Sequence, residues 1–183
     1  MVKNGEAKFY YPNGTLKKIH HFINDKLNGD FFSYDEKGEI TVKGYFKEGK
    51  AIGSIYYFDN KFLFLYNERD FNGDVYYVKK YDNTTHNLIK EEGVCISPNI
   101  VIRKSNSENI QELWFFYTQP DSYVNELFVY MNSNPIKYDI LKGHIIRIRI
   151  NLIEHKNNEI KIFSTLKNGL YVICKDSIKY TII

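Results

Sequence analysis

The stretch from residue 8 to residue 58 repeats itself at an interval of 24 residues. Residues 10–16 align with residues 34–40, and the same offset aligns Gly29 with Gly53. A fixed period of about 20–50 residues is typical of small supersecondary units, none of which can bury its own apolar face alone. The first half of the chain is therefore expected to fold as an array of similar units.

Turn-forming residues divide each unit into two extended segments. Pro12-Asn13-Gly14 and Glu36-Lys37-Gly38 occupy equivalent positions, and Asn-Gly suits the positive φ angles of a tight hairpin. The third unit is about four residues shorter, because Gly53 and Gly73 are only 20 residues apart. We expect strands at residues 8–11, 16–22, 31–34, 40–46, 55–58, 62–66, 75–81 and 88–92.

The period ends after Gly93, and the second half of the chain has a different pattern. Ile146, Ile148 and Ile150 alternate with Arg147 and Arg149, which is typical of a half-buried strand. The expected strands are residues 99–103, 112–118, 126–131, 136–141, 144–153, 159–165, 170–174 and 178–182. The prediction is an all-β chain, with an elongated twisted sheet of hairpins at 1–93 and a β-sandwich or small barrel at 94–183.

The segment from Gly44 to Gly53 resembles a MORN-type repeat. It has the family's order of Gly44, the aromatic Phe46, Gly49-Lys50 and Gly53, followed by an aromatic strand. The preceding copy retains Phe22, Lys26 and Gly29 but has His20 and Asp25 in place of two glycines.

With Tyr-Pro-Asn-Gly in front, the arrangement is most similar to the bacterial MORN variant of proteins described as antitoxin components. The resemblance covers residues 8–58 well and 59–93 weakly, and it does not reach 94–183. It implies consecutive hairpins whose aromatic side chains pack between neighbours. Members of the family are described as scaffolds, lipid-associated modules or toxin-neutralising partners, so the fold does not decide among these functions.

Charge and cysteine spacing exclude several functions. The net charge is +3, and the excess comes from residues 94–183, which have 11 basic and 8 acidic residues. Nucleic-acid-binding domains normally carry a clustered basic face, so no nucleic-acid partner is expected. Cys95 and Cys174 are 79 residues apart and outside any Cys-x-x-Cys pair. We expect two buried cysteines and no metal site, while a disulfide between them stays open.

Catalytic patterns are also missing from the sequence. His20 and His21 are adjacent on an expected strand, so their side chains point to opposite faces. The sequence has no phosphate-binding glycine loop, GxSxG elbow or HExxH motif. The chain is therefore expected to be no enzyme and to use no cofactor.

The aromatic strands are the main candidates for binding, because tyrosine combines contact area with a hydrogen-bonding tip. Arg147 and Arg149 share a strand face and could bind an anion or an acidic partner, with Lys161 on the next strand. The alternative is a solvated outer face. The candidate partner-binding residues are Tyr10, Tyr34, Tyr45, Tyr56, Phe58, Arg147 and Arg149.

These patterns predict a non-enzymatic protein-interaction module, and the resemblance makes an antitoxin or immunity role its most concrete form. The alternative is an exported or surface-associated protein that binds a glycan or a lipid headgroup. The polar N-terminus lacks the apolar segment of a secretion signal, so a cytoplasmic location is expected unless a leader precedes Met1. Association with a membrane surface stays open, as does homo-oligomer formation through exposed strand edges.

Overall fold

The computed structural model describes residues 2–97, 99–104, 109–141, 144–151 and 157–182. These residues form antiparallel strands and no helix, which confirms the all-β prediction. Accordingly, the described residues include no helix that could span a membrane. The chain divides into two compact units, Met1–Gly93 and Val94–Ile183, which are described separately below.

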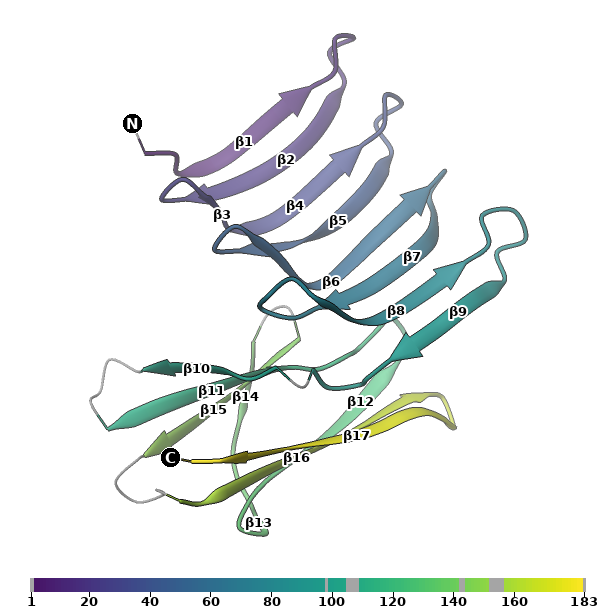
Figure 1. Cartoon of the computed structure of the whole chain (residues 1–183). Coiled ribbons are helices and arrows are strands. Elements are labelled where there is room, and N and C mark those ends of the chain that lie inside the picture. Colours follow the sequence, from purple (N-terminus) through teal and green to yellow (C-terminus); the bar gives the residue numbers. More distant parts are fainter. Residues whose placement is uncertain (1, 98, 105–108, 142–143, 152–156, 183) are drawn as a thin grey trace. The chain divides into compact units, whose positions relative to one another are not determined.

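The first unit contains one antiparallel sheet whose strands follow chain order (Figure 1). Short connections join neighbouring strands, and the connection from β2 to β4 contains the two-residue strand β3, which pairs with β2. The strands are β1 (Gly5–Tyr10), β2 (Leu16–Ile23), β3 (Lys26–Leu27), β4 (Gly29–Tyr34), β5 (Ile40–Lys47), β6 (Lys50–Asp59), β7 (Phe62–Arg69), β8 (Val75–Tyr81) and β9 (Leu88–Gly93).

The 24-residue interval of the sequence recurs in the backbone geometry of this sheet. Pairing shifts between Phe9 and Tyr10 and again between Ser33 and Tyr34. The turns that follow these shifts match as well, because Gly14 and Gly38 have φ angles of +86° and +84°. Glycine adopts such angles without steric cost, so these turns explain the repeated glycines. Equivalent sequence positions therefore have equivalent backbone conformations.

The second unit contains two four-stranded antiparallel sheets. One has the order β10-β11-β15-β14 and the other the order β13-β12-β16-β17. The strands are β10 (Val101–Lys104), β11 (Ile110–Phe116), β12 (Val124–Met131), β13 (Asn134–Pro135), β14 (Asp139–Leu141), β15 (Ile145–Asn151), β16 (Glu159–Asn168) and β17 (Tyr171–Thr181). These strands do not close into a barrel, so the small-barrel alternative is wrong.

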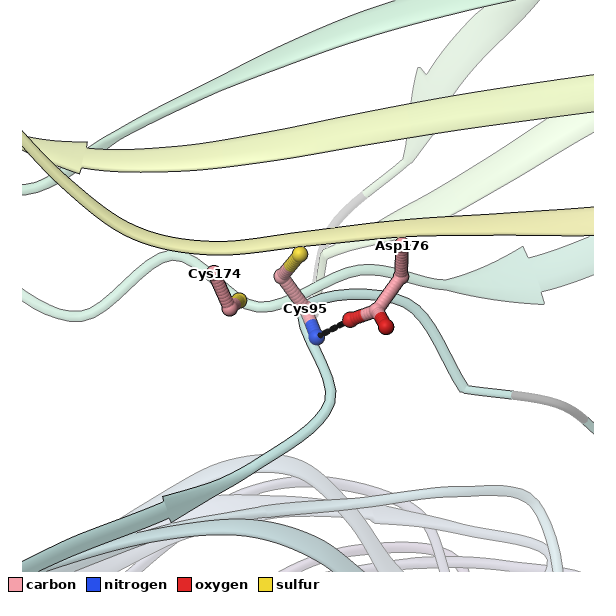
Figure 2. A group of neighbouring side chains, drawn as sticks. All are labelled: Cys95, Cys174 and Asp176. Atoms are coloured by element: carbon pink, nitrogen blue, oxygen red, sulfur yellow. Dashed lines mark hydrogen bonds between the residues drawn. The ribbon is translucent and has the colours of Figure 1, made fainter.

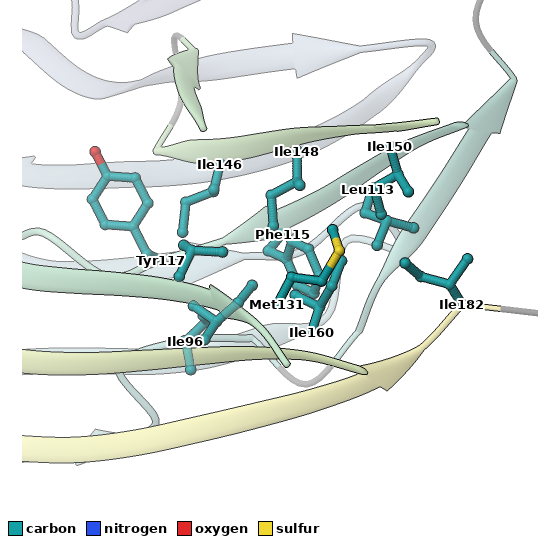
Figure 3. Packing of buried hydrophobic residues seen from close by; sticks show 12 residues of the cluster. Ile96, Leu113, Phe115, Tyr117, Met131, Ile146, Ile148, Ile150, Ile160 and Ile182 are labelled. Atoms are coloured by element: carbon teal, nitrogen blue, oxygen red, sulfur yellow. The ribbon is translucent and has the colours of Figure 1, made fainter. Parts of the chain in front are cut away.

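Apolar side chains from both sheets of the second unit form one buried cluster (Figure 3). On β15, Ile146, Ile148 and Ile150 are at most 1% exposed, while Arg149 between them is exposed. Each buried isoleucine contributes about 1.5–3 kcal/mol through the hydrophobic effect. Period-two alternation thus fixes which face of β15 is buried, as predicted from the sequence.

Two parts of the second unit differ from the sequence-based expectation. The strand expected at residues 136–141 begins only at Asp139. Two strands were expected at residues 170–174 and 178–182, separated by a polar turn. The structure instead has the single strand β17, whose Asp176 pairs with Ser164 on β16. Local polarity at Lys175-Asp176-Ser177 favours a turn, but backbone pairing with the ten-residue strand β16 outweighs it.

Candidate functional site

Five of the seven predicted binding residues lie on one face of the N-terminal sheet. Register places Phe32 opposite Lys43 and Lys43 opposite Tyr56, so these side chains share a face. Tyr10 is 58% exposed, and the other four are half-buried. We call this surface the tyrosine face and define it by Tyr10, Phe32, Tyr34, Lys43, Tyr45, Tyr56 and Phe58.

Lys43 is the centre of a small cation–aromatic group on the tyrosine face. Its Nζ atom lies 4.4 Å from the ring centroid of Tyr56 and 5.6 Å from that of Phe58. The two rings are nearly parallel, at an interplanar angle of 13° and a centroid distance of 6.5 Å. A lysine ammonium group held over aromatic rings contributes about 0.5–1 kcal/mol at exposed sites.

A pocket of about 490 Å³ adjoins this group. Ile40 and Phe58 give it an apolar surface, and Lys43 adds a positive charge. At its rim, Lys61 Nζ lies 3.0 Å from Glu39 Oε1 and forms an ion pair with it. The pocket therefore offers an apolar surface beside one cation that is not part of this ion pair.

The opposite face of the same sheet carries phenylalanine rings around His20. The His20 ring lies 6.0 Å from the ring of Phe46 and 6.4 Å from that of Phe31. Burial lowers the pKa of His20, and the neighbouring charges of Lys18 and His21 lower it further. His21 lies on the other face, where its Nδ1–H donates to the Asp30 carbonyl oxygen at 2.8 Å. The adjacent histidines thus point apart and cannot jointly bind a metal.

A buried polar group links β6 and β7 of the first unit. Ser54 Oγ donates to Glu68 Oε1 at 3.0 Å, and the Tyr66 hydroxyl donates to the same oxygen. Tyr66 and Glu68 are at most 1% exposed. Burial, reinforced by the Glu68 carboxylate, raises the pKa of Tyr66, so this phenol stays protonated.

Arg147 and Arg149 already have acidic partners on the neighbouring strands. Arg147 Nη2 lies 2.7 Å from Asp139 Oδ2 on β14, and Arg149 Nε lies 3.1 Å from Glu112 Oε1 on β11. The hydrogen bond from Arg147 and the charges of both arginines lower the pKa of Asp139. Lys161 lies on the other sheet and forms an ion pair with Glu159. The two arginines therefore form an intramolecular charge network rather than a free anion site.

Cys95, Cys174 and Asp176 converge within the second unit (Figure 2). The two Sγ atoms and a carboxylate oxygen all lie within 4.8 Å of one another. Cys174 and Asp176 are two residues apart on β17 and therefore point to the same side of the strand. Cys95 is fully buried, whereas Cys174 and Asp176 are half-buried.

Hydrogen bonds hold Cys95 in this position. Its N–H donates to Asp176 Oδ2 at 2.6 Å, as Figure 2 shows. Its carbonyl oxygen accepts from the Thr118 N–H at 3.0 Å and from Asn125 Nδ2 at 3.1 Å. Ser164 Oγ in turn donates to Asn125 Oδ1 at 2.8 Å. The cluster is thus supported by residues from several separate segments of the unit.

The two thiols have different acidities. A hydrogen bond from Cys174 lowers the pKa of the Cys95 thiol, and the same bond together with burial raises the pKa of Cys174. Because the two thiols share this hydrogen bond, ionisation of one disfavours ionisation of the other. The thiolate form of cysteine is both the nucleophile and the metal ligand.

No metal ligands were expected from the sequence, and the convergence of these three residues was not predicted. The cysteines are 79 residues apart, and Asp176 was placed in a turn rather than on a strand with Cys174. A usable signal was the Cys174-x-Asp176 spacing, because residues two apart on a strand share a face. That signal requires residues 171–181 to be recognised as one uninterrupted strand.

Comparison with known proteins gives no relative for this chain. No protein-family model matches it, and neither a curated protein nor a solved structure does.

Proposed function

We propose that this chain is a non-enzymatic protein-binding module whose tyrosine face contacts the partner. In this proposal residues 1–93 are a stack of MORN-like hairpin repeats and residues 94–183 are a β-sandwich. Support for the repeats comes from the turns and pairing shifts that recur 24 residues apart, at Gly14 and Gly38 and at Tyr10 and Tyr34. Support for the sandwich comes from the buried cluster that both sheets share.

The observation that carries the proposal is the pocket lined by Lys43 and Phe58, together with the Tyr56 ring that Lys43 contacts. Aromatic side chains that are half-exposed provide contact area while losing little conformational entropy on binding. Interfaces concentrate their binding free energy in a few such residues at the centre of a patch. The tyrosine face combines these properties on one sheet surface.

The charges around the pocket indicate the chemistry of the partner. Glu39 is paired with Lys61, while Lys43 adds a further positive charge among aromatic rings. A protein segment with an apolar side chain flanked by a carboxylate complements this arrangement, because opposite charges across an interface speed and orient association. A toxin neutralised by this chain is the most concrete partner, and this version rests on the MORN resemblance of residues 8–58.

The test uses wild type and two variants of the full chain as bait in cells that produce the protein. It compares which proteins each form retains. The double variant Tyr56→Ala/Phe58→Ala alters the tyrosine face, and Phe163→Ala, which is exposed on β16, is the matched control. The proposal predicts that wild type and control retain the same identified protein and that the double variant loses it. Far-ultraviolet circular dichroism checks that the double variant remains folded.

Two results would contradict the proposal. Equal retention of that protein by the double variant would exclude the tyrosine face as the contact surface. Binding of purified wild type to soluble glycans or anionic vesicles, with no protein retained, would instead favour the ligand-binding alternative. Repeating the binding assay with the purified chain and the purified retained protein then distinguishes direct from indirect association.

A further inference from the structure

We propose that Cys95, Cys174 and Asp176 form a binding site for a thiophilic divalent cation of the Zn²⁺ class. The proposal is independent of the protein-binding function, because it rests on donor atoms in the second unit. All three donor atoms already lie within 4.8 Å of one another. In a tetrahedral site with bonds of about 2.0–2.3 Å, ligand atoms lie roughly 3.3–3.8 Å apart, so small side-chain movements suffice.

The types of donor decide between metals. Two sulfur atoms and one carboxylate oxygen suit Zn²⁺, whereas Ca²⁺ and Mg²⁺ prefer oxygen donors alone. Binding requires both cysteines as thiolates, so their protons pass to solvent when the cation enters. Three protein donors leave a four-coordinate ion with one position for water.

The surroundings of the cluster resemble the supporting shell that orients metal ligands. The Cys95 N–H fixes one Asp176 oxygen at 2.6 Å, and a carboxylate retains further lone pairs for a cation. Thr118 and Asn125 fix the Cys95 carbonyl oxygen at 3.0 Å and 3.1 Å. Such outer partners commonly hold ligands in place and affect metal affinity.

The position of the site also permits entry of an ion. Cys174 and Asp176 are half-buried on β17, which is the last strand of its sheet. Cys95 is the fully buried member and lies in the segment that precedes β10. A bound cation would tie this segment to β17 and so stabilise the second unit.

A disulfide is the competing interpretation of the two cysteines. It would join Cys95 to Cys174, and Asp176 would then serve only as the acceptor for the Cys95 N–H. The convergence of a carboxylate with both sulfur atoms therefore favours a metal ion. Counting the free thiols of the isolated protein separates these two interpretations.

The experiment titrates the tag-free, reduced full chain with Cd²⁺ and follows the thiolate-to-metal charge-transfer absorbance in the ultraviolet. We expect saturation at one Cd²⁺ per chain, and a higher Tm when Zn²⁺ is present. Cys174→Ser should weaken the absorbance and lower Cd²⁺ affinity. Asp176→Asn, which keeps an acceptor for the Cys95 N–H, should retain the absorbance but lower Cd²⁺ affinity, because it replaces a charged carboxylate donor with a neutral amide oxygen.

Ser177→Ala is the control, because its side chain is exposed on the opposite side of β17. It should bind Cd²⁺ like wild type. The proposal is overturned if the reduced chain shows no stoichiometric charge-transfer band, or if Cys174→Ser binds Cd²⁺ as wild type does. Protein that is isolated without reductant should contain two titratable thiols. Absence of both, with a mass lower by two hydrogen atoms, would establish the disulfide instead.

Discussion

Lys43 Nζ lies 4.4 Å from the centroid of the Tyr56 ring, and the two residues face each other across β5 and β6. This pair places a cation on the aromatic surface at the edge of the pocket. It explains how a sheet rich in tyrosine can present charge and apolar area together.

Replacing Lys43 with Met should lower the free energy of unfolding by about 0.5–1 kcal/mol. The variant keeps most of the aliphatic stem but removes the charge over the rings, and a cation–π contact at an exposed site has about this value. Chemical denaturation of the full chain measures the change. Lys37→Met, in an exposed turn, is the control and should leave stability nearly unchanged. Equal effects of both substitutions would contradict a specific contribution from the Lys43–Tyr56 contact.

Gly44→Ala should destabilise the first unit by about 1–3 kcal/mol through overpacking. A Cβ atom at this position would lie 2.7 Å from Phe31 Cε1 and 3.3 Å from Ile55 Cγ1. Phe31→Leu shortens the obstructing side chain, so Gly44→Ala should cost less in that background. A double-mutant cycle measured by thermal unfolding tests this coupling. Additive effects would show that the Phe31 ring does not cause the strain.

Tyr66→Phe should destabilise the chain by about 1–3 kcal/mol, because it removes a donor from the buried Glu68 carboxylate. Ser54 would remain as a donor to the same oxygen. Tyr130→Phe, on the half-buried strand position opposite Lys161, is the comparison and should have a smaller effect. Denaturant midpoints at neutral pH provide the measurement, and equal midpoints for both variants would contradict the role of the buried hydroxyl.

Asp139 should contribute to acid sensitivity. Arg147 and Arg149 lower its pKa in the folded state, so its stabilising contribution is present above the unfolded value of about 3.9. The contribution is lost as pH falls through the lower folded pKa. Asp139→Asn should therefore be less stable than wild type near neutral pH, with a difference that shrinks below about pH 4. Measuring the free energy of unfolding from pH 2 to pH 7 tests this, with the exposed Glu36→Gln as the control. A stability difference between Asp139→Asn and wild type that stays constant with pH would contradict it.

Local sequence patterns predicted the first unit well. Turn residues such as Gly14 and Gly38 set the ends of the strands. Because residues two apart on a strand share a face, Tyr56 and Phe58 were expected on the same side of the sheet. These features depend only on neighbours in the chain. The 24-residue repeat interval consequently predicted the long strands between residues 8 and 58.

Contacts between distant strands could not be predicted in the same way. The pairing of β15 with β11 and β14 brings Glu112 and Asp139 to the arginines, and the sequence does not reveal that strand order. The approach of Cys95 to Cys174 likewise depends on how the segment before β10 meets β17. Both arrangements result from tertiary packing rather than from local propensity.

The most direct test of the central claim is the affinity of the purified full chain for the protein that it retains, measured by isothermal titration calorimetry. If the partner binds through the tyrosine face, Tyr56→Ala/Phe58→Ala should raise the Kd by about 30-fold or more, as expected when central aromatic residues are removed. Phe163→Ala should leave the Kd unchanged. An unchanged Kd for the folded double variant would contradict binding through the tyrosine face.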